Sequence, residues 1–159
     1  MTALNIRQDS PTALHVADLL AYHLQEVRHV MAEHAYALDA AGLSAPNVTF
    51  WTAWHDDRLV GFGALKQMSD THGEVKSMRA DPAALGTGVG RAMLNHIVAE
   101  ARQRGYARLS LETGTAPMHA PAISLYRKAG FVSCDEFADY RPSPRNQFLT
   151  LDLSSWHFQ

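Results

Sequence analysis

The sequence of 159 residues predicts an α/β domain, in which a mixed β-sheet carries helices on both faces. Three observations lead to this prediction. The spacing of apolar residues alternates along the chain between the two-residue period of strands and the 3.6-residue period of helices. Gly and Pro residues stand where the period changes. Apolar residues make up 47% of the chain, enough for one core, and no linker or repeat divides it, so residues 1–159 are expected to form one domain.

The first quarter of the chain is expected to contain one strand and two helices. The segment LNIRQ at 4–8 has the composition of a short strand. Pro11 opens a helix, because apolar residues then recur at helical spacing. These residues are Val16, Leu20, Leu24, Val27 and Met31. The segment 32–42 is expected to continue as a second, shorter helix that ends at Gly42.

Three strands are expected next. Branched and aromatic residues are frequent from 48 to 54 and from 58 to 67, and the polar segment HDD at 55–57 lies between them. This arrangement is typical of a β-hairpin. The segment GEVKSMRA at 73–80 is expected to form the next strand.

The remainder of the chain alternates between helices and strands. A stripe of apolar residues at helical spacing ends at Gly105, and it comprises Val89, Met93, Leu94, Ile97, Val98 and Ala101. The segment 107–113 has the pattern of a buried strand, and 120–130 that of a helix. Two further strands are expected at 131–134 and 146–153.

Charge and cysteine content exclude several classes of function. The formal net charge of −2 gives no basic stripe for nucleic acid. A single cysteine, Cys134, excludes an internal disulfide and a thiolate metal cluster, and the histidines show no metal-ligand spacing, so no metal is expected. No apolar run approaches about 18 residues, and the first ten residues lack a signal-peptide pattern. We therefore expect a cytoplasmic protein that binds no membrane.

A glycine-rich turn directly precedes the helical stripe. Gly86, Gly88 and Gly90 occupy alternate positions in DPAALGTGVGRAML. A helix N-terminus has unpaired N–H groups and a partial positive charge, so a bare turn leading into it can bind an anion such as a pyrophosphate. The spacing fits neither the Walker A loop nor the Rossmann fingerprint. The alternative is a turn that only lets a strand enter a helix tightly.

The context of this turn resembles the Gcn5-related N-acetyltransferase (GNAT) superfamily, and in particular its small bacterial single-domain members. The resemblance rests on EVKSMRADPAALGTGVGRAML, LSLET and APAISLYRKAGF. In the coenzyme A signature Q/R-x-x-G-x-G/A, the two glycines match Gly88 and Gly90, while Leu85 replaces the usual Gln or Arg. The resemblance implies the GNAT acyl-CoA N-acyltransferase fold, with a central, mostly antiparallel sheet.

The resemblance also implies how acetyl-CoA is bound. Backbone atoms of Met78 and Ala80 would pair with the pantetheine, and the amides of residues 86–91 would hold the pyrophosphate. Arg91 or Arg127 would meet the outer phosphates. The complete set expected to bind the cofactor is Met78, Arg79, Ala80, Leu85, Gly86, Thr87, Gly88, Val89, Gly90, Arg91, His119 and Tyr126.

Three residues are candidates for catalysis. Tyr126 lies in LYRKAGF, which matches the family's LYxxxGF, and the match assigns it the protonation of the departing thiolate. Glu112 lies in LET, similar to the LEV strand of ribosomal-protein N-terminal acetyltransferases, where the glutamate is the base. Glu74 stands where many members carry a water-linked glutamate. An acceptor that is already neutral would need no strong base, so the choice stays open.

The expected function is direct acetyl transfer from acetyl-CoA to an amine, because Cys134 is expected in the core and no other nucleophile is evident. A small-molecule acceptor is favoured, since the sequence shows no acidic trench for a protein tail. His23 and Glu26 share one helix face and could line its pocket. Alternatives are an acyl-CoA sensor without activity, a protein N-terminal or lysine acetyltransferase, and a nucleotide-binding regulator. The sequence leaves the oligomeric state open, a homodimer included.

Overall fold

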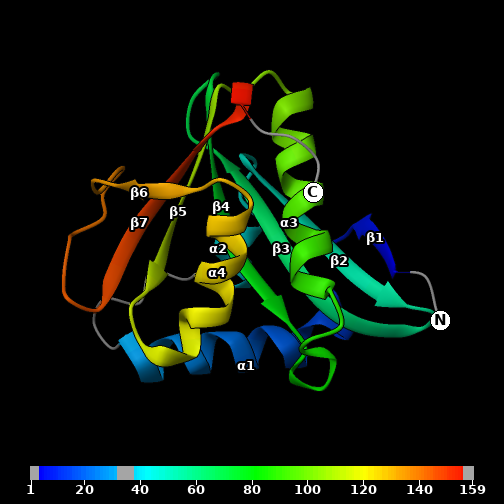
Figure 1. Cartoon of the computed structure of the whole chain (residues 1–159). Helices are drawn as coiled ribbons and strands as arrows, with labels where there is room; N and C mark the ends of the chain where they lie inside the picture. Colours follow the sequence, from blue (N-terminus) through cyan, green and yellow to red (C-terminus); the bar gives the residue numbers. More distant parts are fainter. Residues whose placement is uncertain (1–3, 32–37, 156–159) are drawn as a thin grey trace.

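The computed structural model describes residues 4–31 and 38–155 (Figure 1). The strands in this part are β1 (Leu4–Gln8), β2 (Val48–His55), β3 (Arg58–Gln67), β4 (His72–Ala80), β5 (Arg108–Gly114), β6 (Val132–Cys134) and β7 (Asn146–Asp152). The α-helices are α1 (Leu14–Met31), α2 (Ala40–Leu43), α3 (Val89–Gln103) and α4 (Ala120–Lys128). Short 3₁₀ helices are η2 (Pro82–Ala84), η3 (Pro117–His119) and η4 (Leu153–Ser155).

The described strands form one sheet in the order β1-β2-β3-β4-β5-β7-β6. All neighbours are antiparallel except β4 and β5, which run parallel. A parallel pair needs a crossover connection, and here α3 supplies it. The structure therefore confirms the mixed, mostly antiparallel sheet that the sequence predicts.

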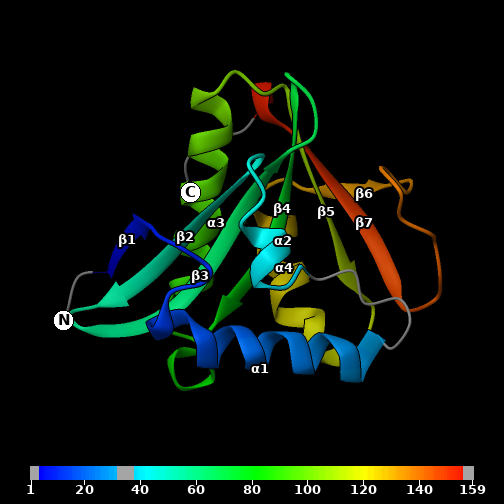
Figure 2. The same cartoon turned by 180° about the vertical axis from the view of Figure 1, so that it is seen from behind.

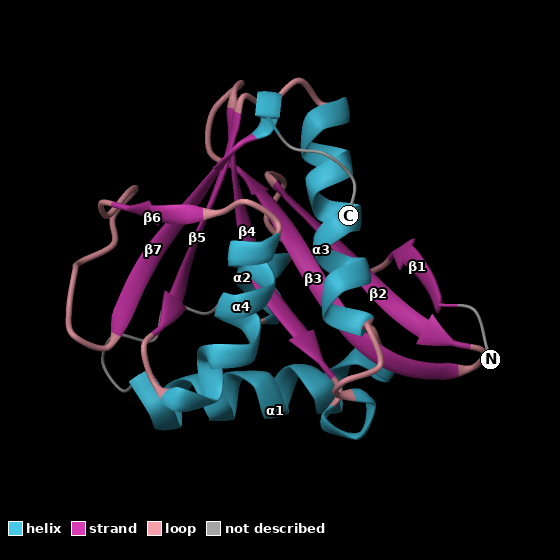
Figure 3. Ribbon diagram, in the orientation of Figure 1, coloured by secondary structure: helices cyan, strands magenta, loops and turns pink. Residues whose placement is uncertain are grey.

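The parallel pair is short, and this shapes the molecule. Partners are found only from His72 to Glu74 on β4 and from Arg108 to Ser110 on β5. Beyond them the two strands diverge into a V whose open end faces α1 (Figure 3). Within β4, Ser77 has a φ of 52°, and the register with β3 shifts beside it. Such a bulge bends a strand and increases its twist, which turns β4 away from β5.

Helices cover both faces of the sheet, as expected. Helices α3 and α4 lie in front of it in Figure 1, and α4 stands before the opening of the V. The view from behind shows α2 on the opposite face and α1 running across the open end (Figure 2). One core includes Met93, Leu94, Ile97, Leu109, Leu111, Phe131 and Leu149, and the other Val16, Leu19, Leu20, Leu43, Phe50 and Phe62.

The second helix differs from the one expected at 32–42. Most of it, residues 32–37, lies outside the described residues. The helix that is described begins only at Ala40, because Asp39 has an extended backbone and its carboxylate accepts a hydrogen bond from the Gly42 amide. This is an N-cap, so the helix at 40–43 is a separate one rather than the end of a continuous helix.

The first helix begins slightly later than expected. Residues from Ser10 form a turn in which the Ala13 amide donates to the Ser10 carbonyl, and the α-helix starts at Leu14. Over the described residues, no helix combines the length and the apolar character that a membrane crossing requires.

Close contact between β3, β4 and α3 at Gly61 gives a test of the fold. A Cβ at Gly61 would lie 2.8 Å from the Arg79 carbonyl oxygen and 2.8 Å from a methyl of Val89. Gly61→Ala is therefore expected to lower the free energy of unfolding by about 1–3 kcal/mol. Chemical denaturation measures this, with Leu14→Ala as the control, because Leu14 is 94% exposed and its loss should cost less than about 0.5 kcal/mol. Equal stability of both variants would contradict the described packing.

Candidate active site

A cleft of about 690 Å³ occupies the V between β4 and β5. Its walls come from α1, β4, the glycine turn, the start of α3, the end of β5, η3 and α4. Segments far apart in the sequence thus meet around one cavity. Beyond Glu74, β4 pairs with β3 alone, so the edge of β4 that faces β5 offers backbone groups to a ligand.

The structure brings together nearly all residues that were expected to bind the cofactor. Those lining the cleft are Met78, Arg79, Ala80, Leu85, Gly86, Gly88, Val89, Gly90, Arg91, His119 and Tyr126. Thr87 is the exception, since its hydroxyl donates to the Ala84 carbonyl and so holds the turn together. Arg127 also lies outside the lining, and its guanidinium donates to the Ser133 hydroxyl over 2.8 Å.

The glycine turn has the geometry of an anion site. Gly86 and Gly88 have φ values of 79° and 90°, a left-handed conformation that side chains disfavour. A Cβ at either position would meet nothing within 4 Å, so the space above the turn is open. Gly88 begins α3 with no side-chain cap, which leaves the amides at the helix start to a ligand. Backbone N–H groups and the helix dipole together suit a phosphate.

The side chains at the end of β4 point to two different sides. Met78 and Ala80 pack against the core beneath α3 and α4. Arg79 turns the other way, toward α1, where its Nε donates to His23 Nδ1 over 3.0 Å and its guanidinium lies 5.6 Å from the Tyr22 ring centre. Successive strand residues face opposite sides, which explains the difference.

Helix α1 forms another wall of the cleft. His23 and Glu26 both line the cleft, as expected. His23 is only 6% exposed, and burial together with the nearby Arg79 charge lowers its pKa to about 3, so the ring is neutral. Glu26 accepts a hydrogen bond of 2.9 Å from the Tyr22 hydroxyl one turn earlier.

Glu112 lies on β5 and lines the cleft. Burial raises the pKa of its carboxyl to about 7, although a hydrogen bond from Asn146 and the charge of Lys76 oppose the rise. The Asn146 amide nitrogen lies 3.2 Å from the Glu112 Oε2. A carboxylate with a pKa near neutrality can accept a proton from an amine under ordinary conditions, so the geometry suits a general base.

Glu74 has a different environment. It is 2% exposed and does not line the cleft. Its carboxylate accepts a hydrogen bond from the Tyr140 hydroxyl, and the Lys76 Nζ lies 3.4 Å from the same oxygen. Glu74 therefore fixes two side chains that do line the cleft, Lys76 and Tyr140. This arrangement favours Glu112 over Glu74 as the base.

Tyr126 is buried on α4, and its ring packs 5.8 Å from that of Phe131. Burial raises the pKa of its phenol to about 12, against a smaller opposing effect of Arg79. The hydroxyl therefore stays protonated near neutral pH and can donate a hydrogen bond into the cleft.

His119 lies on η3, directly over β5. A Cβ at Gly114 would lie 2.2 Å from the His119 ring, so the ring takes the space that Gly114 leaves free. Burial lowers the pKa of His119, and the neutral ring faces the cleft.

The lining also includes residues that were not expected from the sequence, among them Tyr22, Lys76, Ser77, Gly114 and Tyr140. Tyr22 could have been found, because it precedes Glu26 by one helical turn. Tyr140 lies between β6 and β7 in a segment without periodicity, and only its aromatic character in a Pro-containing loop distinguishes it.

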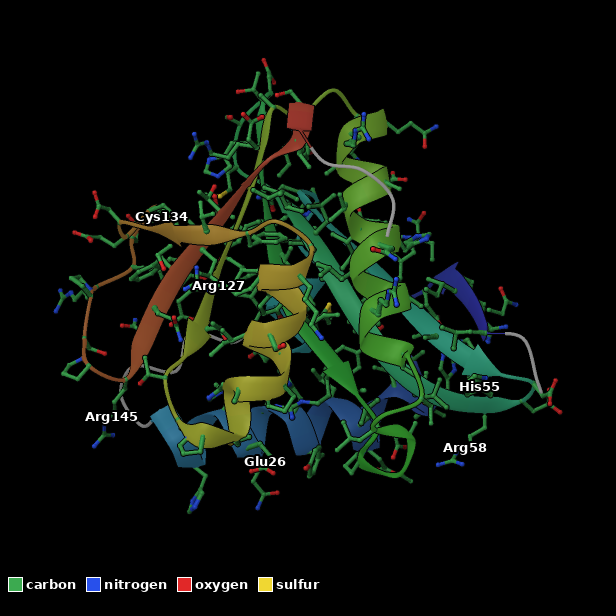
Figure 4. All side chains as sticks on the ribbon, viewed as in Figure 1. Glu26, His55, Arg58, Arg127, Cys134 and Arg145 are labelled. Atoms are coloured by element: carbon green, nitrogen blue, oxygen red, sulfur yellow. The ribbon has the colours of Figure 1, made fainter. Side chains whose placement is uncertain are left out.

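The expectation that Cys134 is a core residue is wrong. It lies on the edge strand β6, partly exposed and away from α1, where Glu26 lies (Figure 4). The short β6 pairs with β7 only, which leaves its residues at the rim. Cys134 is not part of the cleft lining, and burial raises the pKa of its thiol. Among residues 4–31 and 38–155, no group of three or more potential metal ligands occurs.

Two relatives match almost the whole chain. An uncharacterized N-acetyltransferase of Bacillus subtilis, YsnE, is 42% identical over 94% of this chain and 100% of its own length. A second, YedL of Escherichia coli, is 44% identical over 93% of this chain and 94% of its own. Both identities lie far above the level at which a fold alone is shared.

A solved structure agrees with this result. The putative acyl-CoA N-acyltransferase of Klebsiella pneumoniae superimposes with a TM-score of 0.79 at 29% identity, covering 94% of this chain and 97% of that one. The model of the acetyltransferase (GNAT) family matches residues 13–131, which include the V, the glycine turn and α4. With this match and these relatives, the chain belongs to the GNAT family of acetyltransferases and is an acyltransferase enzyme.

Proposed function

We propose that this enzyme transfers the acetyl group of acetyl-CoA directly to the amine of a small molecule. The observation that carries the proposal is the position of Glu112: a carboxyl with a pKa of about 7 lines the same cleft as the glycine turn. An anion-binding turn and a base on one cavity are the two parts that this reaction needs.

The residues present fit acetyl-CoA. The turn from Gly86 to Gly90 offers backbone donors and open space for the pyrophosphate, and Arg91 stands beside it. The unpaired edge of β4 at Met78 and Ala80 offers backbone groups to the pantetheine amides. These contacts would direct the thioester into the V, toward Glu112.

The proposed chemistry forms one bond and breaks another. The amine nitrogen attacks the acetyl carbonyl carbon, its proton passes to Glu112, and the C–S bond breaks to release the thiolate. A thiolate whose acid has a pKa of about 8.5 is a weaker base than the phenolate of Tyr126, whose pKa is about 12. Full proton transfer from Tyr126 is therefore uphill, and we propose that its hydroxyl stabilises the thiolate by a hydrogen bond.

A small acceptor is supported by the closure of the V. Helix α1 crosses its open end, and the cavity of about 690 Å³ must hold both the acetyl-bearing end of the donor and the acceptor (Figure 2). A sensor without activity would bind the donor through the same turn but release no thiol. The single-domain organisation and the cytoplasmic location stay predictions of the sequence, which leaves the oligomeric state open.

The glycine turn can be tested with a matched pair of variants. Gly88 and Gly105 both have positive φ and no atom within 4 Å of a Cβ, but Gly105 follows α3 at its far end. Gly88→Ala and Gly105→Ala should lose a similar stability, about 1 kcal/mol. Only Gly88→Ala should weaken acetyl-CoA binding, by about tenfold or more in calorimetry, because its methyl group would occupy the open space above the turn that the pyrophosphate needs. Equal affinities would refute the role of the turn.

If Glu112 is the base, its pKa of about 7 should be visible in the pH dependence of kcat/KM. With any amine that supports thiol release, the ratio of the wild-type kcat/KM to that of Glu112→Gln should fall about tenfold per pH unit below pH 7, where Glu112 is protonated. Glu112→Gln should lose at least about 100-fold at pH 8, with a difference that shrinks toward pH 5. The titration of the amine is common to both proteins and cancels. Glu100→Gln, a surface change on α3, is the control, and an unchanged profile in Glu112→Gln would rule this base out.

Tyr126→Phe keeps the ring and its packing on Phe131 but removes the hydroxyl. Loss of a hydrogen bond to a charged group lowers kcat by about 10- to 100-fold. Thermal stability and acetyl-CoA affinity should stay near the wild-type values. A folded variant with wild-type kcat would mean that Tyr126 only packs.

A further inference from the structure

We infer that the acceptor carries a carboxylate as well as its amine, and that Arg79 binds this carboxylate. The inference rests on the proposed function, and it names the substrate class as small amino-carboxylates such as amino acids. Four features of the cleft lead to it.

The first feature is the way in which the Arg79 guanidinium is held. Its Nε–H donates to His23 Nδ1 over 3.0 Å, and its plane lies near the ring of Tyr22. Because His23 is neutral and accepts at Nδ1, the proton of its ring is on Nε2. The two Nη groups of Arg79 are left as a fixed fork, the arrangement that binds carboxylates through two parallel hydrogen bonds.

The second feature is that no described carboxylate forms an ion pair with Arg79, although the charge of Glu26 acts on it from beyond 4.0 Å. Within residues 4–31 and 38–155, no carboxylate lies within 4.0 Å of the half-buried Arg79 guanidinium. Glu26 on the same wall accepts from the Tyr22 hydroxyl instead. Lys76, by contrast, has Glu74 at 3.4 Å. A partly desolvated cation without an ion-pair partner gains much from an arriving anion.

The third feature is the direction in which the Arg79 side chain points. Arg79 faces α1, whereas Met78 and Ala80 face the core beneath α3 and α4. The donors of the glycine turn begin α3, so they serve the phosphate on that side. The fork of Arg79 is therefore free for a second ligand that enters along α1.

The fourth feature is a pair of buried polar atoms that belong to residues of the cleft lining. Within the described part of the chain, His23 Nε2 and Ser77 Oγ are buried and have no hydrogen-bond partner. Both residues line the cleft, and only 6% of the His23 surface is exposed. Buried polar groups are normally paired, so their state points to a polar ligand in the cleft.

These features complement the position of Glu112. Arg79 belongs to β4 and Glu112 to β5, the two arms of the V. A molecule whose amine lies at Glu112 and whose carboxylate lies at Arg79 would bridge the arms and be oriented at both ends. Such two-point binding holds the attacking nitrogen in place.

The test uses amines that differ only in the carboxylate. Phenylalanine is compared with phenethylamine, leucine with 3-methylbutylamine and tryptophan with tryptamine, and thiol release gives kcat/KM. The wild type should prefer the carboxylated member of at least one pair by about 30-fold or more. In Arg79→Met the preference should fall below about threefold, and Arg79→Lys, which keeps the charge without the fork, should lie between. Wild-type activity on the bare amines without preference for any carboxylated member would overturn the inference.

A binding experiment covers the case in which no pair turns over. The N-acetyl derivatives of the twenty amino acids are titrated by calorimetry into the protein saturated with coenzyme A. At least one should bind the wild type, and Arg79→Met should raise its Kd by about 30-fold or more while the Kd of coenzyme A stays the same. The inference fails if none binds, or if Arg79→Met weakens coenzyme A instead, which would make Arg79 a donor-binding residue. The proposed function fails separately, if acetyl-CoA does not bind or no amine releases thiol.

Discussion

The divergence of β4 and β5 is the constraint on which the rest of the structure depends. Their parallel pairing ends after three residues on each strand, at Glu74 and Ser110. The bulge at Ser77 turns β4 away, and the backbone edge beyond it loses its partner strand. Every group of the candidate site is placed relative to this gap: the glycine turn follows β4, Glu112 lies near the end of β5, α4 stands before the opening and α1 crosses its end. A sheet with full pairing there would have no cavity.

The two glutamates beside the gap show how environment assigns a role. Glu74 lies at the point where the strands still pair, and Lys76 and Tyr140 satisfy its charge. Glu112 lies further along β5, beyond the last residue that pairs with β4. There burial raises the pKa of its carboxyl to about 7, against the opposing effect of the hydrogen bond from Asn146. Glu74 is thus held by a hydrogen bond and an ion pair inside the sheet, while the Glu112 carboxyl faces the cleft with a pKa near neutrality. The same residue type serves both purposes because the surroundings differ.

Alternation along β4 separates the two sides on which we propose that donor and acceptor bind. Met78 and Ala80 face the side of α3 and α4, where the glycine turn begins the helix, and Arg79 faces α1. A strand that is bare on one edge can therefore bind one ligand through its backbone while its side chain is directed at another. The bulge at Ser77 sets which residues face which side, and with them the side from which Arg79 would bind an acceptor in our proposal.

The sequence by itself determined the elements and the glycine turn. Strands, helices and the left-handed glycines depend on neighbours two to four residues apart, and such local patterns are visible in one dimension. The tertiary structure alone decided which glutamate faces the cleft, that Arg79 turns to α1, and that Tyr140 joins the site. The Arg79–His23 contact joins residues 56 positions apart and the Tyr140–Glu74 contact residues 66 apart. Such contacts are set by strand register, the bulge and the packing of helices, which no local pattern encodes.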